Sequence, residues 1–191
     1  MVDHFVALGM ATRAAEYYKA FLTCSSKIIR ANGGSIVAYD GDRVMAIYVG
    51  ERASINAVYT ALKITSAVTQ IINPEFESYY GIGHRLLRHT VGIDRGTLLA
   101  VKAGVRNDND MVWVGPAANY AAKLNSFPGL DPAFPVRATA AVVDSVRRVI
   151  TRLSDNSDIW DGPYHDLKRD DGSELAHFRT SLRSDIDATW S

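Results

Sequence analysis

The segment that most constrains this fold is a tight turn between two apolar β-type runs, over residues 33–48. The turn carries Asp40-Gly41-Asp42, and glycine tolerates the positive φ that short hairpin turns need. The segment therefore predicts a β-hairpin with carboxylates at its tip. Asp42 is expected just past the turn, where it can face a ligand such as Mg²⁺, which is bound through one or two carboxylates and phosphate oxygens. The alternative is an ordinary solvated turn, because acids and glycine favour turns for local reasons.

A second segment, residues 111–124, has the pattern of a short apolar strand, a Gly115-Pro116 break and the start of a helix. Asn119 and Lys123 lie four residues apart, which places both side chains on one face of a helix. An amide and a cation in this arrangement can reach the same ligand. The alternative is an ordinary exposed helix face.

Together and in this order, the two segments resemble the class III nucleotidyl cyclase family, the catalytic domain of adenylate and guanylate cyclases. Gly41-Asp42 and the strand after it match the family's hairpin motif. Between the two segments, Gly92-Ile93 and Gly96 match a Gly-Ile-x-x-Gly strand pair. The helix motif is matched by Gly115, Asn119 and Ala121, while Lys123 replaces an arginine. The resemblance covers most of the chain.

Composition is that of a soluble globular protein, with 191 residues, 47% hydrophobic and 22% charged. We therefore expect one cyclase-like domain over residues 1–191. The fold class expected is α+β, with a central mixed, mostly antiparallel sheet flanked by helices. The periodicity predicts helices over 12–30, 54–72 and 142–153, a loop over 75–83, strands over 87–93 and 97–103, a polar turn over 106–110, and a final hairpin of 164–168 with 174–180.

Charge and cysteine content exclude several classes of partner. The 21 basic and 21 acidic residues balance, so nothing favours electrostatic capture of nucleic acid or of an anionic membrane. Cys24 is the only cysteine, which excludes an intrachain disulfide and suits a reducing compartment. No apolar run approaches the roughly 20 residues that span a bilayer, and the N-terminus lacks signal-peptide character. We therefore expect a cytoplasmic protein.

The resemblance implies a reaction in which the ribose 3′-hydroxyl attacks the α-phosphate of a nucleoside triphosphate, giving a 3′,5′-cyclic nucleotide and pyrophosphate. Two Mg²⁺ or Mn²⁺ ions per site would assist it. Asp42 matches the second of two metal-binding carboxylates. Asp3, 39 residues earlier, is the candidate for the first, although the apolar half-strand expected before it is absent. Either Asp3 serves with a shortened connection, or the strand and its acid lie upstream, or a metal ligand has been lost; Asp3 in a frayed terminus is the structural alternative.

Other site residues follow from the same resemblance. Asn119 matches the residue that orients the ribose, and Lys123 occupies the position of the transition-state arginine, keeping the charge but losing the planar fork. Lys168 stands near the position where relatives place a triphosphate-binding lysine; the alternative is a solvated loop charge. Arg43 either contacts phosphate or merely flanks the turn.

The positions that read a purine base in the family are occupied here by Ala38 and Val112, and neither side chain can form a hydrogen bond. Purine discrimination would be lost, because it depends on satisfying particular donors and acceptors. Tyr39 offers a hydroxyl and a ring, although it is equally explained as a strand aromatic. The departure is similar to the bacterial pyrimidine cyclases that make cyclic UMP or cyclic CMP in phage defence, so UTP or CTP is the expected substrate. A purine cyclase and a catalytically silent nucleotide-binding domain remain as alternatives.

The resemblance also implies a head-to-tail homodimer. In the family, the metal-binding face of one protomer meets the helix corresponding to Asn119 and Lys123 of the other. Two equivalent sites would then form across a two-fold axis, and a monomer would lack a complete site.

Overall fold

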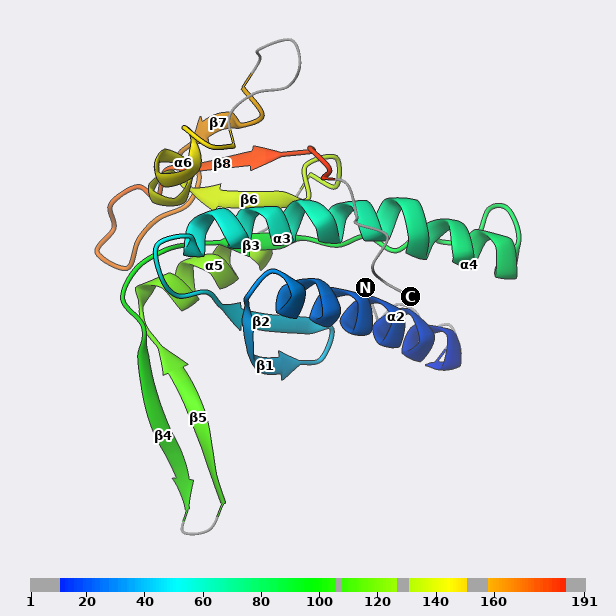
Figure 1. The fold of residues 1–191 in the computed structure, drawn as a ribbon, viewed down its shortest axis with the longest axis horizontal. Helices are drawn as coiled ribbons and strands as arrows, with labels where there is room; N and C mark the ends of the chain where they lie inside the picture. Colours follow the sequence, from blue (N-terminus) through cyan, green and yellow to red (C-terminus); the bar gives the residue numbers. More distant parts are fainter. Residues whose placement is uncertain (1–10, 106–107, 127–130, 151–157, 185–191) are drawn as a thin grey trace.

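The first described part of the chain is a long helix followed by a hairpin (Figure 1). The computed structural model describes residues 11–105, 108–126, 131–150 and 158–184. Helix α2 spans Ala11–Ala31, and strands β1 (Ser35–Asp40) and β2 (Arg43–Ile47) pair antiparallel. Asp40 lies opposite Arg43, so Gly41 and Asp42 form the turn, with Gly41 at φ 58°. The predicted helix and hairpin are confirmed, with Asp42 inside the turn itself.

The central sheet has four strands in the order β3-β6-β8-β7. These strands are β3 (Val91–Ile93), β6 (Val136–Thr139), β8 (His177–Thr180) and β7 (Asp161–Tyr164). β3 and β6 are parallel, whereas β6–β8 and β7–β8 are antiparallel. The expected mixed, mostly antiparallel pairing is therefore confirmed.

A second hairpin projects away from this sheet, at the lower left of Figure 1. Its strands, β4 (Leu99–Val105) and β5 (Asp108–Val114), pair antiparallel with Leu99 opposite Val114 and Val101 opposite Val112. The described strands thus form three sheets, which are the four-stranded central sheet and the two hairpins.

Helices cover both faces of the central sheet. Helix α3 (Ala53–Ala67) continues through a π-helical turn, Val68–Ile72, into α4 (Asn73–Tyr80), while α5 (Pro116–Ser126) follows β5 and α6 (Ala140–Val146) follows β6. Within the described ranges, no helix combines the length and apolar character that a membrane-spanning segment needs.

The main core lies between the sheet and the helices α3 and α6. It is formed by buried aliphatic side chains of both helices together with β-strand residues, among them Val58, Leu62, Ile93, Val136, Ala138, Val142, Val146 and Phe178. A second cluster joins α2 to the other side of α3 and includes Tyr17, Ile28, Ile64, Val68 and Leu87. Helix α3 therefore joins α2 to the sheet, since it contributes to both clusters.

Several predicted boundaries were wrong. The loop expected over 75–83 is largely helical, because Pro74 occupies the first turn of α4, where proline favours helix initiation. Strand β3 starts only at Val91, and α6 ends at Val146. The polar turn expected over 106–110 is shorter, since β5 begins at Asp108 and residues 106–107 lie outside the described part.

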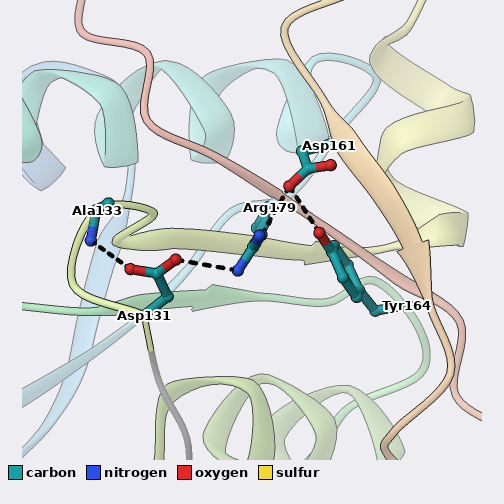
Figure 2. A network of polar contacts seen from close by, with 5 residues as sticks. All are labelled: Asp131, Ala133, Asp161, Tyr164 and Arg179. Atoms are coloured by element: carbon teal, nitrogen blue, oxygen red, sulfur yellow. Dashed lines mark hydrogen bonds and ion pairs between the residues drawn. The ribbon is translucent and has the colours of Figure 1, made fainter.

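Arg179 of β8 ties the edge of the sheet to the segment before β6 (Figure 2). Its guanidinium donates to Asp161 of β7 at 2.8 Å and to Asp131 at 3.3 Å. The Tyr164 hydroxyl also donates to Asp161, at 2.7 Å. Hydrogen bonds from Tyr164 and Arg179 hold the pKa of Asp161 below its usual value. One arginine thus anchors both ends of the last hairpin, which carries part of the candidate site described below.

Helix α5 packs directly on β3 at Gly92. Neighbouring strand residues point to opposite faces, and Ile93 faces the core with α3. Gly92 therefore faces α5, and a Cβ atom there would overlap the main-chain oxygen of Ala121. Gly96 of the same sequence motif has room, because its added Cβ would lie 3.5 Å from the Cβ of Ala117.

We expect Gly92→Ala to lower the free energy of unfolding by about 2–3 kcal/mol, because the new methyl group meets helix backbone that cannot rotate away. Urea denaturation followed by circular dichroism measures this. Gly96→Ala is the matched control and should stay within about 0.5 kcal/mol of the parent protein. Equal stability of the two variants would contradict the close approach of α5 to β3.

Candidate functional site

The tip of the first hairpin presents one uncommitted carboxylate. Arg43 donates to Asp40 at 2.7 Å, with side-chain exposures of 53% and 77%. This pair closes the base of the turn, since Asp40 and Arg43 are register partners. Asp42 is exposed between them, and no ion pair joins it to another described residue. The arginine predicted to contact phosphate or flank the turn is thus engaged by its neighbour, whereas Asp42 faces solvent.

Asp42 borders a cavity of about 1400 Å³ between the first hairpin, α2, α3, β3 and α5. The opposite wall includes Asp94 at the end of β3, His89 before it, and the α5 residues Ala118, Ala121 and Ala122. The space is large enough for a nucleotide-sized ligand. Asp42 and the alanine face of α5 thus line the same cavity.

Asn119 and Lys123 lie on a different side of α5. Neither residue lines the cavity, although Ala118, Ala121 and Ala122 of the same helix do. Successive helix residues are rotated by about 100°, so residues 119 and 123 share a face that points away from residues 118, 121 and 122. Within one chain, Asp42 and the Asn119–Lys123 face therefore belong to different surfaces.

Lys123 is held by contacts that the sequence did not predict. Its Nζ donates to Oδ1 of Asp170 at 2.7 Å and lies 5.2 Å from the centre of the Tyr120 ring. The Arg169 guanidinium lies 5.3 Å from the same ring. Two cations thus lie over the buried Tyr120 ring, and one of them, Lys123, is paired with Asp170. No spacing pattern signals this group, because the segment after β7 follows α5 by more than forty residues.

Lys168 precedes Arg169 on the same exposed turn and forms an isolated antiparallel bridge with Glu174. The turn places Lys168 two residues from Asp170, the partner of Lys123. Its proposed role toward triphosphate remains a prediction.

The three candidate base-contact residues lie on two different hairpins. Ala38 and Tyr39 are exposed on β1, with Tyr39 at 54%, and the Tyr39 hydroxyl forms a 2.9 Å hydrogen bond with Ser26 Oγ of α2. Val112, 43% exposed on β5, shares one face of the second hairpin with three other exposed apolar residues, Leu99, Val101 and Val114. This face is called the apolar ladder below.

Among the described residues, Asp42 can bind a hard cation, but no set of protein ligands encloses one. No group of three or more His, Cys, Asp or Glu side chains is gathered anywhere in the described ranges. Mg²⁺ is commonly bound by one or two carboxylates and completes its shell with water and substrate phosphates. An exposed Asp42 at a large cavity suits that mode. Asp3, the other predicted ligand, lies outside the described residues.

Two titratable groups in the cavity wall are shifted by burial. His89 Nε2 lies 3.1 Å from the Thr65 hydroxyl, which itself donates to the Ala61 carbonyl and so accepts from the imidazole. Burial lowers the pKa of His89 to about 4. Burial raises the pKa of Asp94, although the hydrogen bond donated by Thr139 opposes the shift. His89 is therefore neutral at neutral pH.

Sequence comparison gives relatives with one shared name. No family model matches the chain. Uridylate cyclase of Burkholderia cepacia is 45% identical over 152 residues, covering 80% of this chain and 63% of that protein. Uridylate cyclases of Xanthomonas perforans (51% over 115 residues) and of a Rhodovulum species (36% over 152 residues) cover 60% and 77% of this chain. The chain spans 50–63% of the length of these curated relatives.

Solved structures with the same fold are cyclase domains. The adenylyl cyclase CyaB from P. aeruginosa superimposes with a TM-score of 0.71 at 17% identity, covering 96% of this chain and 90% of that chain. The guanylyl cyclase Cya2 gives a TM-score of 0.70 at 12% identity, covering 91% and 83%.

The buried neutral His89 predicts a pH-dependent stability. Its folded pKa of about 4 lies below the ordinary value of 6.5, so the unfolded chain takes up a proton that the folded chain excludes. Above pH 6.5 neither state takes up this proton, so the free energy of unfolding has its full value. On the order of 3 kcal/mol of it should be lost as pH falls from 6.5 to 4. Urea denaturation at several pH values measures the slope.

His89→Gln is the variant for this test, because its amide can still donate to Thr65 but does not titrate. Its unfolding free energy should fall less steeply between pH 6.5 and 4 than that of the parent protein. His177 and Asp94 titrate in both proteins, so the difference between the two slopes isolates residue 89. Parallel slopes would contradict a buried, neutral His89.

Proposed function

Because the chain has the class III nucleotidyl cyclase fold and its curated relatives are named uridylate cyclases, we propose that it is a nucleotidyl cyclase. Its reaction would convert UTP or CTP to the 3′,5′-cyclic nucleotide and pyrophosphate. The observation that carries the proposal is the placement of the motif residues: Asp42 in a hairpin turn, and Asn119 and Lys123 one turn apart on one helix face. This arrangement supports the motif match made from the sequence.

In this proposal Lys123 stabilises negative charge that develops on the α-phosphate, and Asn119 orients the ribose through its side-chain amide. Lys123 supplies a compact ammonium where the family has an arginine, so it contacts phosphate as a point charge and not as a bidentate fork. Lys168, exposed on the neighbouring turn, would approach the triphosphate. Arg43 would first have to leave Asp40, so we assign it the role of closing the turn.

Asp42 would hold Mg²⁺ or Mn²⁺ together with oxygens of the triphosphate, and we propose Asp3 as the second carboxylate. When bound, such ions lower the pKa of the attacking hydroxyl and neutralise the triphosphate. The protein's own contribution is an exposed carboxylate on a short turn, with its neighbouring acid already neutralised by Arg43.

A pyrimidine substrate is supported by the side chains at the base-reading positions. Ala38 and Val112 offer no donor or acceptor for a purine edge. The Tyr39 hydroxyl is engaged with Ser26, and the ring is 54% exposed, so it offers mainly an aromatic surface to a base. We propose that Tyr39, Ala38 and Val112 together form the base pocket.

The proposed enzyme is a head-to-tail homodimer of single cyclase domains with shared sites. Two features of one chain support this. Asn119 and Lys123 point away from the cavity that Asp42 borders, which supports a second copy supplying one half of each site. The apolar ladder of the projecting hairpin, with exposures from 43% to 61%, offers that copy a hydrophobic contact surface that includes Val112.

We further propose that the cyclic pyrimidine nucleotide is a second messenger in phage defence, made in the cytoplasm. The similarity to bacterial pyrimidine cyclases supports this role. Neither nucleic acid nor a membrane is a proposed partner, in keeping with the balance of charges.

The first prediction is the product. Purified protein with Mn²⁺ or Mg²⁺ and each of UTP, CTP, ATP and GTP, analysed by mass spectrometry, should give cyclic UMP or cyclic CMP. Asp42→Ala should reduce product formation at least 100-fold, because it removes a charge that holds the metal–triphosphate complex. Cyclic AMP or GMP as the main product would contradict the base assignment. No cyclic product with any substrate would indicate a silent domain.

The second prediction tests the shared site. Asp42→Ala and Lys123→Ala proteins should each be inactive, and mixing them should restore roughly a quarter of the parent activity. Random exchange gives half heterodimers, each with one of two sites intact. Co-purification of differently tagged variants shows that they mix. Mixed, folded variants that stay inactive would refute a site built from two protomers.

A further inference from the structure

We propose that Asp170 is a positioning residue that holds Lys123 in a resting ion pair, and that the triphosphate displaces it on binding. This inference rests on the proposed function, because it assigns a partner to Lys123, the cation of that site, in the protein without substrate. Asp170 lies outside the sequence motifs that support the proposed function.

The geometry of the pair is direct. Lys123 Nζ and Asp170 Oδ1 are 2.7 Å apart, although the two residues come from α5 and from the turn between β7 and β8. Their side chains are 40% and 66% exposed. An ion pair this exposed contributes little net stability, so another anion can replace the carboxylate without unfolding anything.

The turn that carries Asp170 is fixed by its own hydrogen bonds. The Arg169 amide donates to the Ser173 carbonyl at 2.7 Å, and the Gly172 amide donates to the Arg169 carbonyl at 3.0 Å. Asp171 accepts bonds from the Ser173 amide and hydroxyl at 2.9 and 2.6 Å. Asp171 therefore stabilises the turn, and Asp170 is left to face Lys123.

The surroundings of the pair favour a polyanion over a single carboxylate. Lys123 and Arg169 lie 5.2 and 5.3 Å from the same Tyr120 ring, and Lys168 precedes Arg169. The ring is buried, with 7% exposure, so it fixes the positions of both cations. The other carboxylates of the turn have partners of their own, Asp171 with Ser173 and Glu174 with His165, so Asp170 is the one that faces Lys123. A triphosphate carries several negative charges where Asp170 carries one, so it interacts more strongly with the same cations.

It follows that Asp170 competes with the substrate for Lys123. Removing its charge should strengthen triphosphate binding by about two- to fivefold, the range expected when an exposed ion pair no longer has to be broken. The chemical step should change less than twofold, because Asp170 has already left Lys123 when the reaction begins. The change is therefore expected in KM and not in kcat.

The experiment measures binding of inorganic tripolyphosphate to the full chain by calorimetry, in parallel with KM and kcat for the pyrimidine triphosphate. Asp170→Asn should bind tripolyphosphate two- to fivefold more tightly, and Asp170→Ser should do the same. Asp170→Glu should retain the parent affinity. Asp171→Asn is the matched control, since it removes the same charge one residue away but keeps an oxygen for Ser173.

A second background makes the test specific. In a Lys123→Ala protein, Asp170→Asn should have no effect on tripolyphosphate binding, since the competing pair is absent. Unchanged or weaker binding by Asp170→Asn, equal strengthening by Asp171→Asn, or the same gain without Lys123 would each overturn the proposal. A parent protein that does not bind tripolyphosphate would overturn it as well.

The outcomes separate this inference from the proposed function. Tighter tripolyphosphate binding by Asp170→Asn without any cyclic product would support the resting pair and refute the cyclase activity. Cyclic product from every variant with one unchanged KM would support the activity and refute the resting pair.

Discussion

The contact between α5 and β3 at Gly92 sets the geometry of the candidate site. Because residue 92 has no side chain, the backbone of α5 lies directly on the strand, next to Ala121. Burial of Tyr120 and Leu124 then fixes the rotation of the helix, since both are apolar anchors on its inner side. With that rotation fixed, the alanine face closes the cavity, and Asn119 and Lys123 are turned outward. Close approach at Gly92 and burial of Tyr120 and Leu124 together decide where Asn119 and Lys123 point.

This rotation also has an electrostatic consequence. An exposed cation and an exposed carboxylate that meet within one chain form an ion pair, as Arg43 and Asp40 do at 2.7 Å. Asp42 and Lys123 are kept apart because they lie on different surfaces of the molecule. Under the proposed dimer, the two charges approach only when copies meet, and the space between them is then available to a ligand that carries both a metal and phosphate. In the proposed dimer, the separation of Asp42 from Lys123 within one chain is therefore what allows the two residues to meet between chains.

Local patterns predicted local structure well and tertiary contacts poorly. The hairpin around Gly41 and the helix of residues 12–30 were predicted correctly, because turn chemistry and helical periodicity are properties of neighbouring residues. The helix α4 was missed because the sequence predicts a loop over 75–83, whereas Pro74 stands in the first turn of a helix. Asp42, Asn119 and Lys123 were identified through motifs. Asp170 and Arg169 were not, because their relation to Lys123 exists only once the chain has folded.

The lysine at position 123 and the carboxylate at position 170 are consistent with each other in physical terms. An arginine in this position would present a planar fork to Asp170 and form two parallel hydrogen bonds, a stronger and more specific pair. A lysine makes a single contact to Oδ1, and with 40% of its side chain exposed it remains hydrated. Such a pair orients the ammonium without competing strongly for it. The lysine that replaces the motif's arginine therefore suits the proposed site, in which the cation has a resident partner and exchanges it for the triphosphate.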